Sequence, residues 1–151
     1  MRTFALIFIP VLLLITFTGM ASAQAPSAVT NGMPNGRFWS RRTQDEKVAW
    51  LLGYLDGIKT ATVFVSGAEP DNKLLQQYVL DLRPTDKLTP EEIIQGMDHF
   101  YQDTPENAPV PLVGALQYVG TKAKGAKQSE LDDLASSMRK KSTGTASEKK
   151  P

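Results

Sequence analysis

The chain has 151 residues, of which 41% are hydrophobic, 22% charged and 8% aromatic, and its formal net charge is +1. This composition argues against collagenous, coiled-coil and fully disordered proteins, and the near-neutral charge argues against a dedicated nucleic-acid binder. The sequence has no Cys. Thiolate zinc sites, iron–sulfur clusters, covalent c-type haem and thiol nucleophiles are therefore excluded.

Residues 1–23 have the three parts of a secretory signal peptide: a positive charge at Arg2, an apolar run over residues 4–17, and an Ala-x-Ala step ending at Ala23. The alternative is an uncleaved membrane anchor, because the apolar run approaches the ~20 residues of a spanning helix. Pro10 within the run favours cleavage. We expect a mature protein in the bacterial periplasm or outside the cell, with no integral membrane segment after cleavage.

The mature chain divides by composition into four segments. These are a flexible linker with turns at Asn31-Gly32 and Asn35-Gly36, a single helical domain, a basic amphipathic helix extension and a disordered tail, over residues 24–36, 37–120, 121–141 and 142–151. The net charge is −4 over residues 24–120 and +4 over residues 121–151. A basic tail of this strength is more often solvated than bound to nucleic acid.

The first helix of the domain is predicted from a capping box between Thr43 and Glu46, and it should run to about residue 65. Its apolar residues cover an arc of roughly 160°, which predicts a central helix with more than one neighbour. Gly53, Gly57 and Ala61 form a ridge of small residues on this helix. The ridge predicts close packing against another element.

Further helices follow at regular intervals. Apolar residues at helical spacing predict a helix over residues 71–82, a second one capped by Thr89 with Pro90 at its first position, a third opening at residues 109–111, and a last one beginning near Ser129. No internal repeat and no long alternating pattern is present. The predicted fold is an all-α, single-domain bundle of four to five helices after a signal peptide.

His99 is the only His in the chain, and it shares a helix face with Glu92 and Asp103. A carboxylate–imidazole–carboxylate stripe of this kind could form a general base or a metal site. The alternative is an ordinary exposed helix face, and we favour it because zinc sites usually need more than one His or Cys. We assign no catalytic, cofactor-binding or metal-binding residue and expect no cofactor.

Two other groups of residues are assigned to structure before function. Adjacent carboxylates at the starts of predicted helices point about 100° apart, so capping and dipole roles explain them better than acid–base catalysis. Aromatic residues are assigned first to core packing and second to a binding groove; they are Phe38, Trp39, Trp50, Tyr54, Phe64, Phe100, Tyr101 and Tyr118.

Several short motifs together resemble the Rap/Tai family of small secreted immunity proteins. They are Asn35-Gly36 followed by Trp39, Gly53-Tyr54-Leu55-Asp56-Gly57, Leu88-Thr89-Pro90-Glu91, Phe100-Tyr101, Pro105-Glu106-Asn107 and Pro109-Val110-Pro111-Leu112. The resemblance covers roughly residues 35–119. It implies an all-helical periplasmic protein that tends to form a homodimer and neutralises a peptidoglycan amidase toxin delivered by type VI secretion. Members usually carry a pair of Cys, which this chain lacks.

Three functions remain open at this point. The first is an exported, non-enzymatic protein-binding module, with an immunity-like inhibitor of a cell-wall amidase toxin as its specific form. The second is an exported hydrolase of envelope polymers that uses Glu92, His99 and Asp103. The third is a structural, envelope-associated protein that uses its basic tail.

Overall fold

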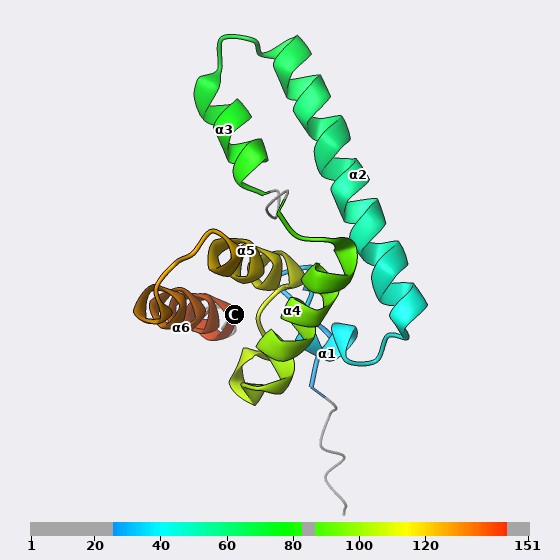
Figure 1. Ribbon diagram of the computed structural model, residues 1–151, viewed down its shortest axis with the longest axis vertical. Coiled ribbons are helices and arrows are strands. Elements are labelled where there is room, and N and C mark those ends of the chain that lie inside the picture. The colour runs from blue at the N-terminus through cyan, green and yellow to red at the C-terminus, as the bar shows by residue number, and fades with distance from the viewer. Residues whose placement is uncertain (1–25, 83–86, 145–151) are drawn as a thin grey trace, which may run out of the picture.

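The computed structural model describes residues 26–82 and 87–144, which are mostly helical and confirm the all-α prediction (Figure 1). In chain order the elements are β1 (Val29–Thr30), β2 (Met33–Pro34), α1 (Gly36–Trp39), α2 (Gln44–Ala68), α3 (Lys73–Asp81), α4 (Pro90–Gln102), the 3₁₀ helix η1 (Pro105–Asn107), α5 (Leu112–Ala123) and α6 (Gln128–Gly144). The predicted signal peptide, residues 24 and 25 of the predicted linker, and residues 145–151 of the predicted tail lie outside the described ranges.

The prediction of a flexible linker is wrong for residues 26–36. β1 and β2 form an antiparallel hairpin in which Thr30 pairs with Met33. Asn31 and Gly32 form its two-residue turn and both have positive φ, at 52° and 78°. Asn-Gly is the sequence that favours such a turn. The predicted turn at Asn35-Gly36 is instead the start of α1, where the buried Asn35 side chain accepts from the Arg37 backbone N–H at 3.0 Å.

The helices α2 and α4 begin where their capping boxes predict. The Thr43 backbone N–H donates to the Glu46 carboxylate at 2.8 Å, and the Glu46 N–H donates to the Thr43 hydroxyl at 3.3 Å. The same reciprocal pair between Thr89 and Glu92 begins α4. The Thr43 N–H, followed by the neighbouring Arg42 guanidinium, lowers the pKa of Glu46. Both carboxylates therefore have the capping role expected from the sequence.

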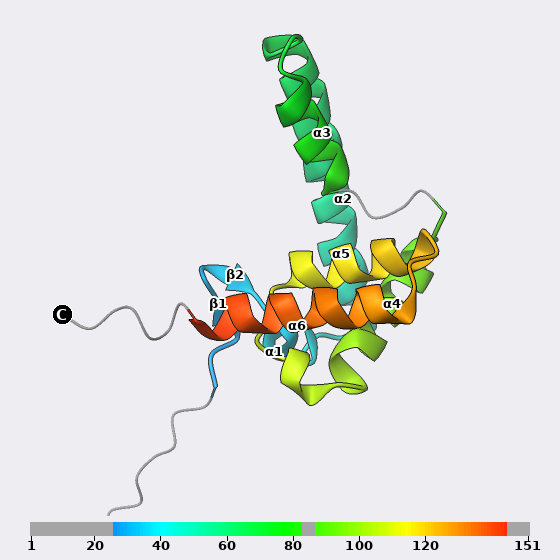
Figure 2. The same ribbon diagram turned by 90° about the vertical axis from the view of Figure 1, so that its left-hand side faces the viewer.

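The core lies where α4 and α5 cross α1, α6 and the first turns of α2 (Figures 1 and 2). Its buried side chains are Trp39, Leu51, Ile93, Ile94, Met97, Phe100, Tyr101, Val110, Leu112, Ala115, Leu116, Val119 and Ala135. The apolar faces predicted for the helices that became α4 and α5 supply most of them. Burial raises the pKa of Tyr101, whose hydroxyl donates to the Val110 carbonyl at 2.9 Å.

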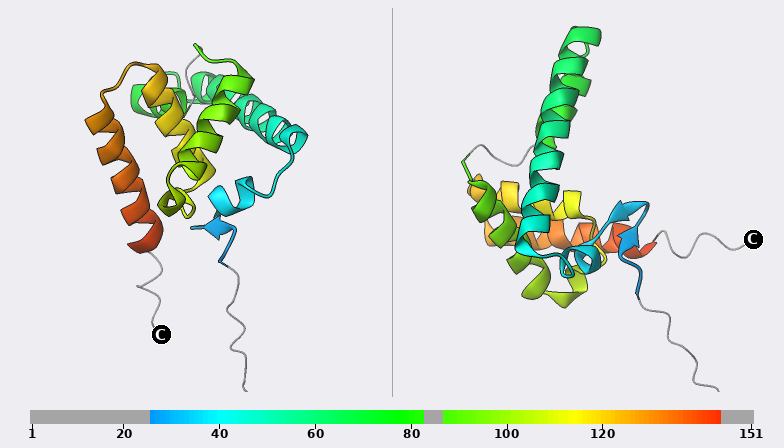
Figure 3. Two further views of the ribbon diagram at one scale, coloured as in Figure 1. Left: turned by 60° about the horizontal axis from the view of Figure 1, so that its bottom comes forward. Right: turned by 90° about the vertical axis from the view of Figure 1, so that its right-hand side faces the viewer.

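The rest of α2 and all of α3 form an antiparallel helical hairpin that rises out of this globular part, and we call this hairpin the arm (Figures 1 and 3). α2 contacts both α3 and α4, so the prediction of more than one neighbour is confirmed. The prediction that α2 is a central helix is nevertheless wrong, because Lys47 and Leu51 are its only buried residues. The predicted small-residue packing ridge is also wrong. A Cβ added at Gly53 or Gly57 would have no atom within 4 Å. The helix extends past the core, and beyond Leu51 it has α3 along one side.

The C-terminal boundaries also differ from the prediction. The 121–141 extension contains the end of α5, a break and most of α6, and α6 continues through residues 142–144 of the predicted tail. Gly125 has a φ of 88° in the break between the two helices, which favours a residue without a Cβ. α6 packs along α5 and buries Leu131 and Ala135 (Figure 2). It is therefore part of the folded domain.

Candidate protein-interaction surfaces

The predicted stripe of Glu92, His99 and Asp103 lies on the solvent side of α4. The His99 Nδ1 is 3.4 Å from an Asp103 carboxylate oxygen, and the two side chains are 71% and 70% exposed. The Glu92 carboxylate accepts the Thr89 N–H at 2.7 Å in the capping box, so it is directed to the helix terminus. Within residues 26–82 and 87–144, no group of three His, Cys, Asp or Glu residues is placed to hold a metal ion.

The cavity beside His99 is small, at about 130 Å³. Its lining includes Gly96, Phe100 and Tyr118, and its acid–base groups beside His99 are the exposed side chains of Asp103 and Lys122. Ligand sites for small molecules usually have volumes of several hundred Å³. The geometry of this region corresponds to the exposed helix face that the sequence favoured.

A partly buried polar cluster around Asp98 was missed by sequence reasoning. One Asp98 carboxylate oxygen accepts from the Trp39 indole N–H at 2.7 Å and lies 2.7 Å from the Lys47 ammonium. The Lys47 and Asp98 side chains are 11% and 24% exposed. Because the three residues come from α1, α2 and α4, the cluster joins these helices. Its enclosed position gives it a structural role.

The aromatic residues are assigned correctly to packing, with one exception. Those buried in the core or packed against it are Phe38, Trp39, Trp50, Tyr54, Phe100, Tyr101 and Tyr118. The exception is Phe64, which is 72% exposed near the end of α2. Its predicted role in the core is wrong, because α2 has left the globular part at that point.

Exposed apolar side chains of the described residues are concentrated on the arm. They include Leu74 at 86% exposure, and the others on the arm are Leu52, Val63, Phe64, Tyr78 and Leu80. Single exposed apolar residues are ordinary, whereas a group of them on one projecting element is typical of an interaction site. The arm is therefore the part of the described structure best suited to contact another protein.

An apolar cleft of about 530 Å³ lies at the base of the arm, where α3 approaches the β1–β2 hairpin, α5 and α6. Its apolar walls come from Met33, Tyr78, Leu82, Val110, Pro111, Val113 and Met138. Asn31, Gln117, Lys141 and Ser142 add polar groups to the lining. Gly114 also lines the cleft, where a Cβ would come within 2.9 Å of a Val110 methyl group. An apolar cleft with a few polar groups is the usual form of a binding site.

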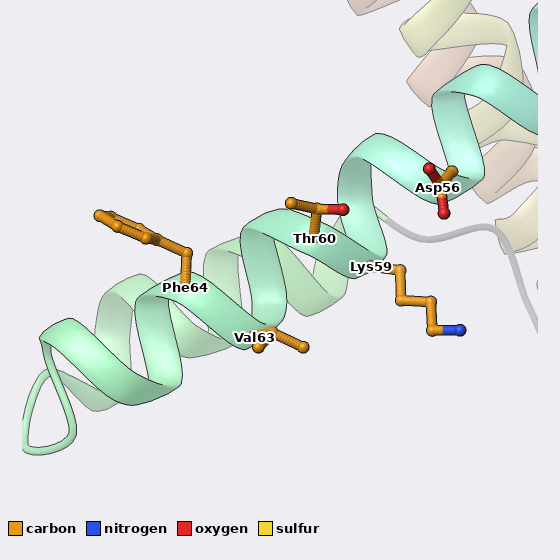
Figure 4. A pocket seen from close by; sticks show the side chains of 5 residues that line it. All are labelled: Asp56, Lys59, Thr60, Val63 and Phe64. Carbon is orange, nitrogen blue, oxygen red and sulfur yellow. The ribbon is translucent and has the colours of Figure 1, made fainter.

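A second surface lies on the side of α2 that faces away from α3. A shallow hollow of about 420 Å³ is lined there by Asp56, Lys59, Thr60, Val63 and Phe64. Figure 4 shows these side chains projecting from successive turns of the helix. The hollow is mainly apolar, with one acidic and one basic side chain.

α2 is also long and apolar enough to cross a membrane, judged by length and composition alone. The expectation of no integral membrane segment after cleavage assumed that no later segment reaches spanning length, and α2 corrects that assumption. Asp56 and Lys59 lie near the middle of the helix, which makes a lipid environment unfavourable. Core helices of soluble proteins meet the same length and composition criteria.

No family model, curated protein or solved structure matches the chain. Sequence periodicity identified the helix that carries the α2 surface and placed Asp56, Lys59 and Thr60 opposite its apolar arc, but Phe64 was assigned to packing. The cleft joins residues from positions 31 to 142. No single sequence motif carries a signal for it.

Proposed function

We propose that the protein is an exported, non-enzymatic module that binds another protein through the cleft at the base of the arm. The observation that carries the proposal is the apolar lining of this cleft beside the exposed Tyr78 and Met33. Apolar surface left in water has a free-energy cost that a partner removes on binding. A projecting apolar side chain or helix end of the partner is the ligand that fits such a cleft.

The walls of the cleft can adapt to a protein ligand. Met33 and Met138 lie among the lining residues, and Met side chains fill irregular apolar spaces because they are flexible and polarizable. Gln117 and Ser142 provide hydrogen-bonding groups. Apolar contacts would supply most of the affinity, and the polar groups would orient the partner segment.

The resemblance to the Rap/Tai family provides the partner class for this proposal, a peptidoglycan amidase toxin. In this role the protein acts in the periplasm or outside the cell, without an integral membrane segment after cleavage of residues 1–23. It would block the toxin by contact and without chemistry of its own. The hydrolase and structural alternatives have no specific observation in their favour among the described residues.

The test is inhibition of purified peptidoglycan amidase toxins acting on isolated cell-wall sacculi. We expect the exported chain to inhibit one such toxin, and Tyr78→Glu to weaken the inhibition by roughly 10-fold or more, because a carboxylate in an apolar cleft opposes partner burial. Inhibition of none of the toxins by the wild-type chain would reject the partner class. Degradation of sacculi by the chain alone would support the hydrolase.

The matched control is Leu74→Glu, which makes the same change one helical turn earlier on α3. Leu74 is more exposed than Tyr78 and is not among the residues that line the cleft. We expect this variant to inhibit like the wild-type chain. Equal loss in both variants would assign binding to the whole apolar arm and reject the cleft as the site.

A further inference from the structure

The side of α2 that faces away from α3 carries a regularly spaced row of residues that no other part of the described chain covers. Six residues follow alternating spacings of three and four: Ala49, Leu52, Asp56, Lys59, Val63 and Ser66. All six are exposed. This spacing is that of the a and d positions of a coiled coil, through which one helix packs against another.

The repeat is symmetric about a point between Gly57 and Ile58. When a second α2 lies antiparallel about that point, Leu52 faces Val63, Asp56 faces Lys59, and Ala49 faces Ser66. Every a position then faces a d position. A two-fold interface must be complementary to itself in this way, because the same surface is used by both copies.

Charge selects the antiparallel orientation. Within the part of the chain that the structure describes, Asp56 and Lys59 have no ion pair or hydrogen bond. In the antiparallel arrangement each Asp56 faces a Lys59 of the other copy, so two opposite-charge pairs form at the centre. A parallel pair in the same register would place Asp56 opposite Asp56, and like charges facing each other are unfavourable.

Small residues beside the repeat allow the two helices to approach closely. Gly53, Thr60 and Gly67 lie along one flank of it, and a Cβ added at either Gly would have no atom of the described chain within 4 Å. Gly in a helix interior has a cost of ~1 kcal/mol relative to Ala. The two exposed Gly residues are explained if a second helix lies against this flank.

We propose that a second copy of this chain covers the outer face of α2, with the two helices antiparallel and Asp56 of each copy paired with the partner subunit's Lys59. The interface leaves the cleft and α3 uncovered, because α3 lies on the other side of α2. It is therefore separate from the proposed partner site, and either proposal can fail without the other.

The first test is the dimer dissociation constant of the exported chain, measured by sedimentation equilibrium. We expect wild-type dimers, and we expect Asp56→Lys or Lys59→Asp alone to weaken the dimer by roughly 10-fold or more, because each places like charges at the centre. The double variant Asp56→Lys/Lys59→Asp should restore the wild-type constant to within about 3-fold. Failure of the double variant to restore it would overturn the proposed pairing.

Disulfide trapping tests the orientation, since the chain has no Cys of its own. Leu52→Cys/Val63→Cys should form a covalent dimer on mild oxidation, because the two positions face each other across the interface. Within one helix they are eleven residues apart, or about 16 Å, too far for an internal disulfide. Leu52→Cys alone is the matched control and should remain monomeric on denaturing gels.

The remaining outcomes decide against the proposal. Efficient cross-linking of Leu52→Cys alone would show a parallel interface and overturn it. A monomeric wild-type chain at millimolar concentration would do the same. So would flotation of the exported chain with phosphatidylethanolamine–phosphatidylglycerol vesicles when Leu52→Glu abolishes it, because lipid would then be the occupant of this face.

Discussion

At the scale of single residues, Asp98 makes the contacts that hold α1, α2 and α4 in their relative positions. Its carboxylate receives both the Trp39 indole N–H and the Lys47 ammonium. Lys47 also lies 5.3 Å from the Trp39 ring centroid, in position for a cation–π contact. Lys is rarely buried without an ionic partner. Loss of Asp98 would leave a buried charge and a buried N–H without an acceptor.

Asp98→Ala should therefore lower the free energy of unfolding by about 2 to 4 kcal/mol. The control is Asp103→Ala on the same helix, which removes an exposed pair with His99 worth ~0.2 to 0.5 kcal/mol. Urea denaturation followed by circular dichroism measures both variants. Equal effects of the two substitutions would contradict a structural role for the Asp98 cluster.

At the scale of elements, Gly36 and Gly53 both lie in helices, but one is tightly packed and the other has open space beside it. A Cβ added at Gly36 in α1 would overlap the ring of Tyr101, whereas Gly53 in α2 has open space around the corresponding position. Gly36→Ala should lower the free energy of unfolding by about 1 to 3 kcal/mol through overpacking. Gly53→Ala should raise it by roughly 0.5 to 1 kcal/mol, because Ala favours the helix.

Thermal melts at a low protein concentration, where the monomer predominates, give the two shifts without a contribution from association. The melting temperature should fall for the first variant and rise for the second. A lower melting temperature in both variants would mean that the face of α2 at Gly53 is packed within a single chain, as the small-residue ridge predicted from the sequence requires.

Some elements of this fold follow from local sequence signals, whereas others depend on distant contacts. Capping boxes are local, so Thr43 and Thr89 predicted the helix starts correctly. Periodicity predicted the buried face of α4 correctly, because the core extends along the whole of that helix. For α2, periodicity predicted an apolar face, but it does not indicate how many turns of the helix lie against the core. The linker prediction failed because a short hairpin is held in part by the Asn35–Pro111 bridge, a distant contact that local composition does not encode.

At the scale of the whole molecule, the cleft and the Asp98 cluster join segments that are far apart in the sequence. Trp39 and Asp98 are 59 residues apart. Elsewhere in the fold, Arg139 donates to the Asn107 side-chain oxygen at 2.8 Å across 32 residues. The residue types that create these contacts are ordinary at their positions. Their importance follows from the fold, which is why the sequence analysis assigned no site residue.

The division into a globular part and an arm predicts different local stabilities. α4 buries five side chains in the core, whereas Val79 of α3 is buried outside the core cluster. Segments with few buried contacts open at lower free energies than the core. Native-state hydrogen exchange should therefore show α3 amides exchanging at least tenfold faster than α4 amides after correction for intrinsic rates, or about 1.4 kcal/mol in opening free energy.

The proposed dimer provides a check on the same measurement. Association through the outer face of α2 should slow exchange in α2 as the concentration rises, while α3 and α4 keep their difference, because neither lies in that interface. Tyr54 allows a second check of the arm, because its hydroxyl donates to the Leu82 carbonyl at 2.8 Å and so connects α2 to the end of α3. Tyr54→Phe should therefore speed exchange at the end of α3 and leave α4 unchanged. Equal protection of α3 and α4 at every concentration would show that the arm and the globular part unfold as one cooperative unit.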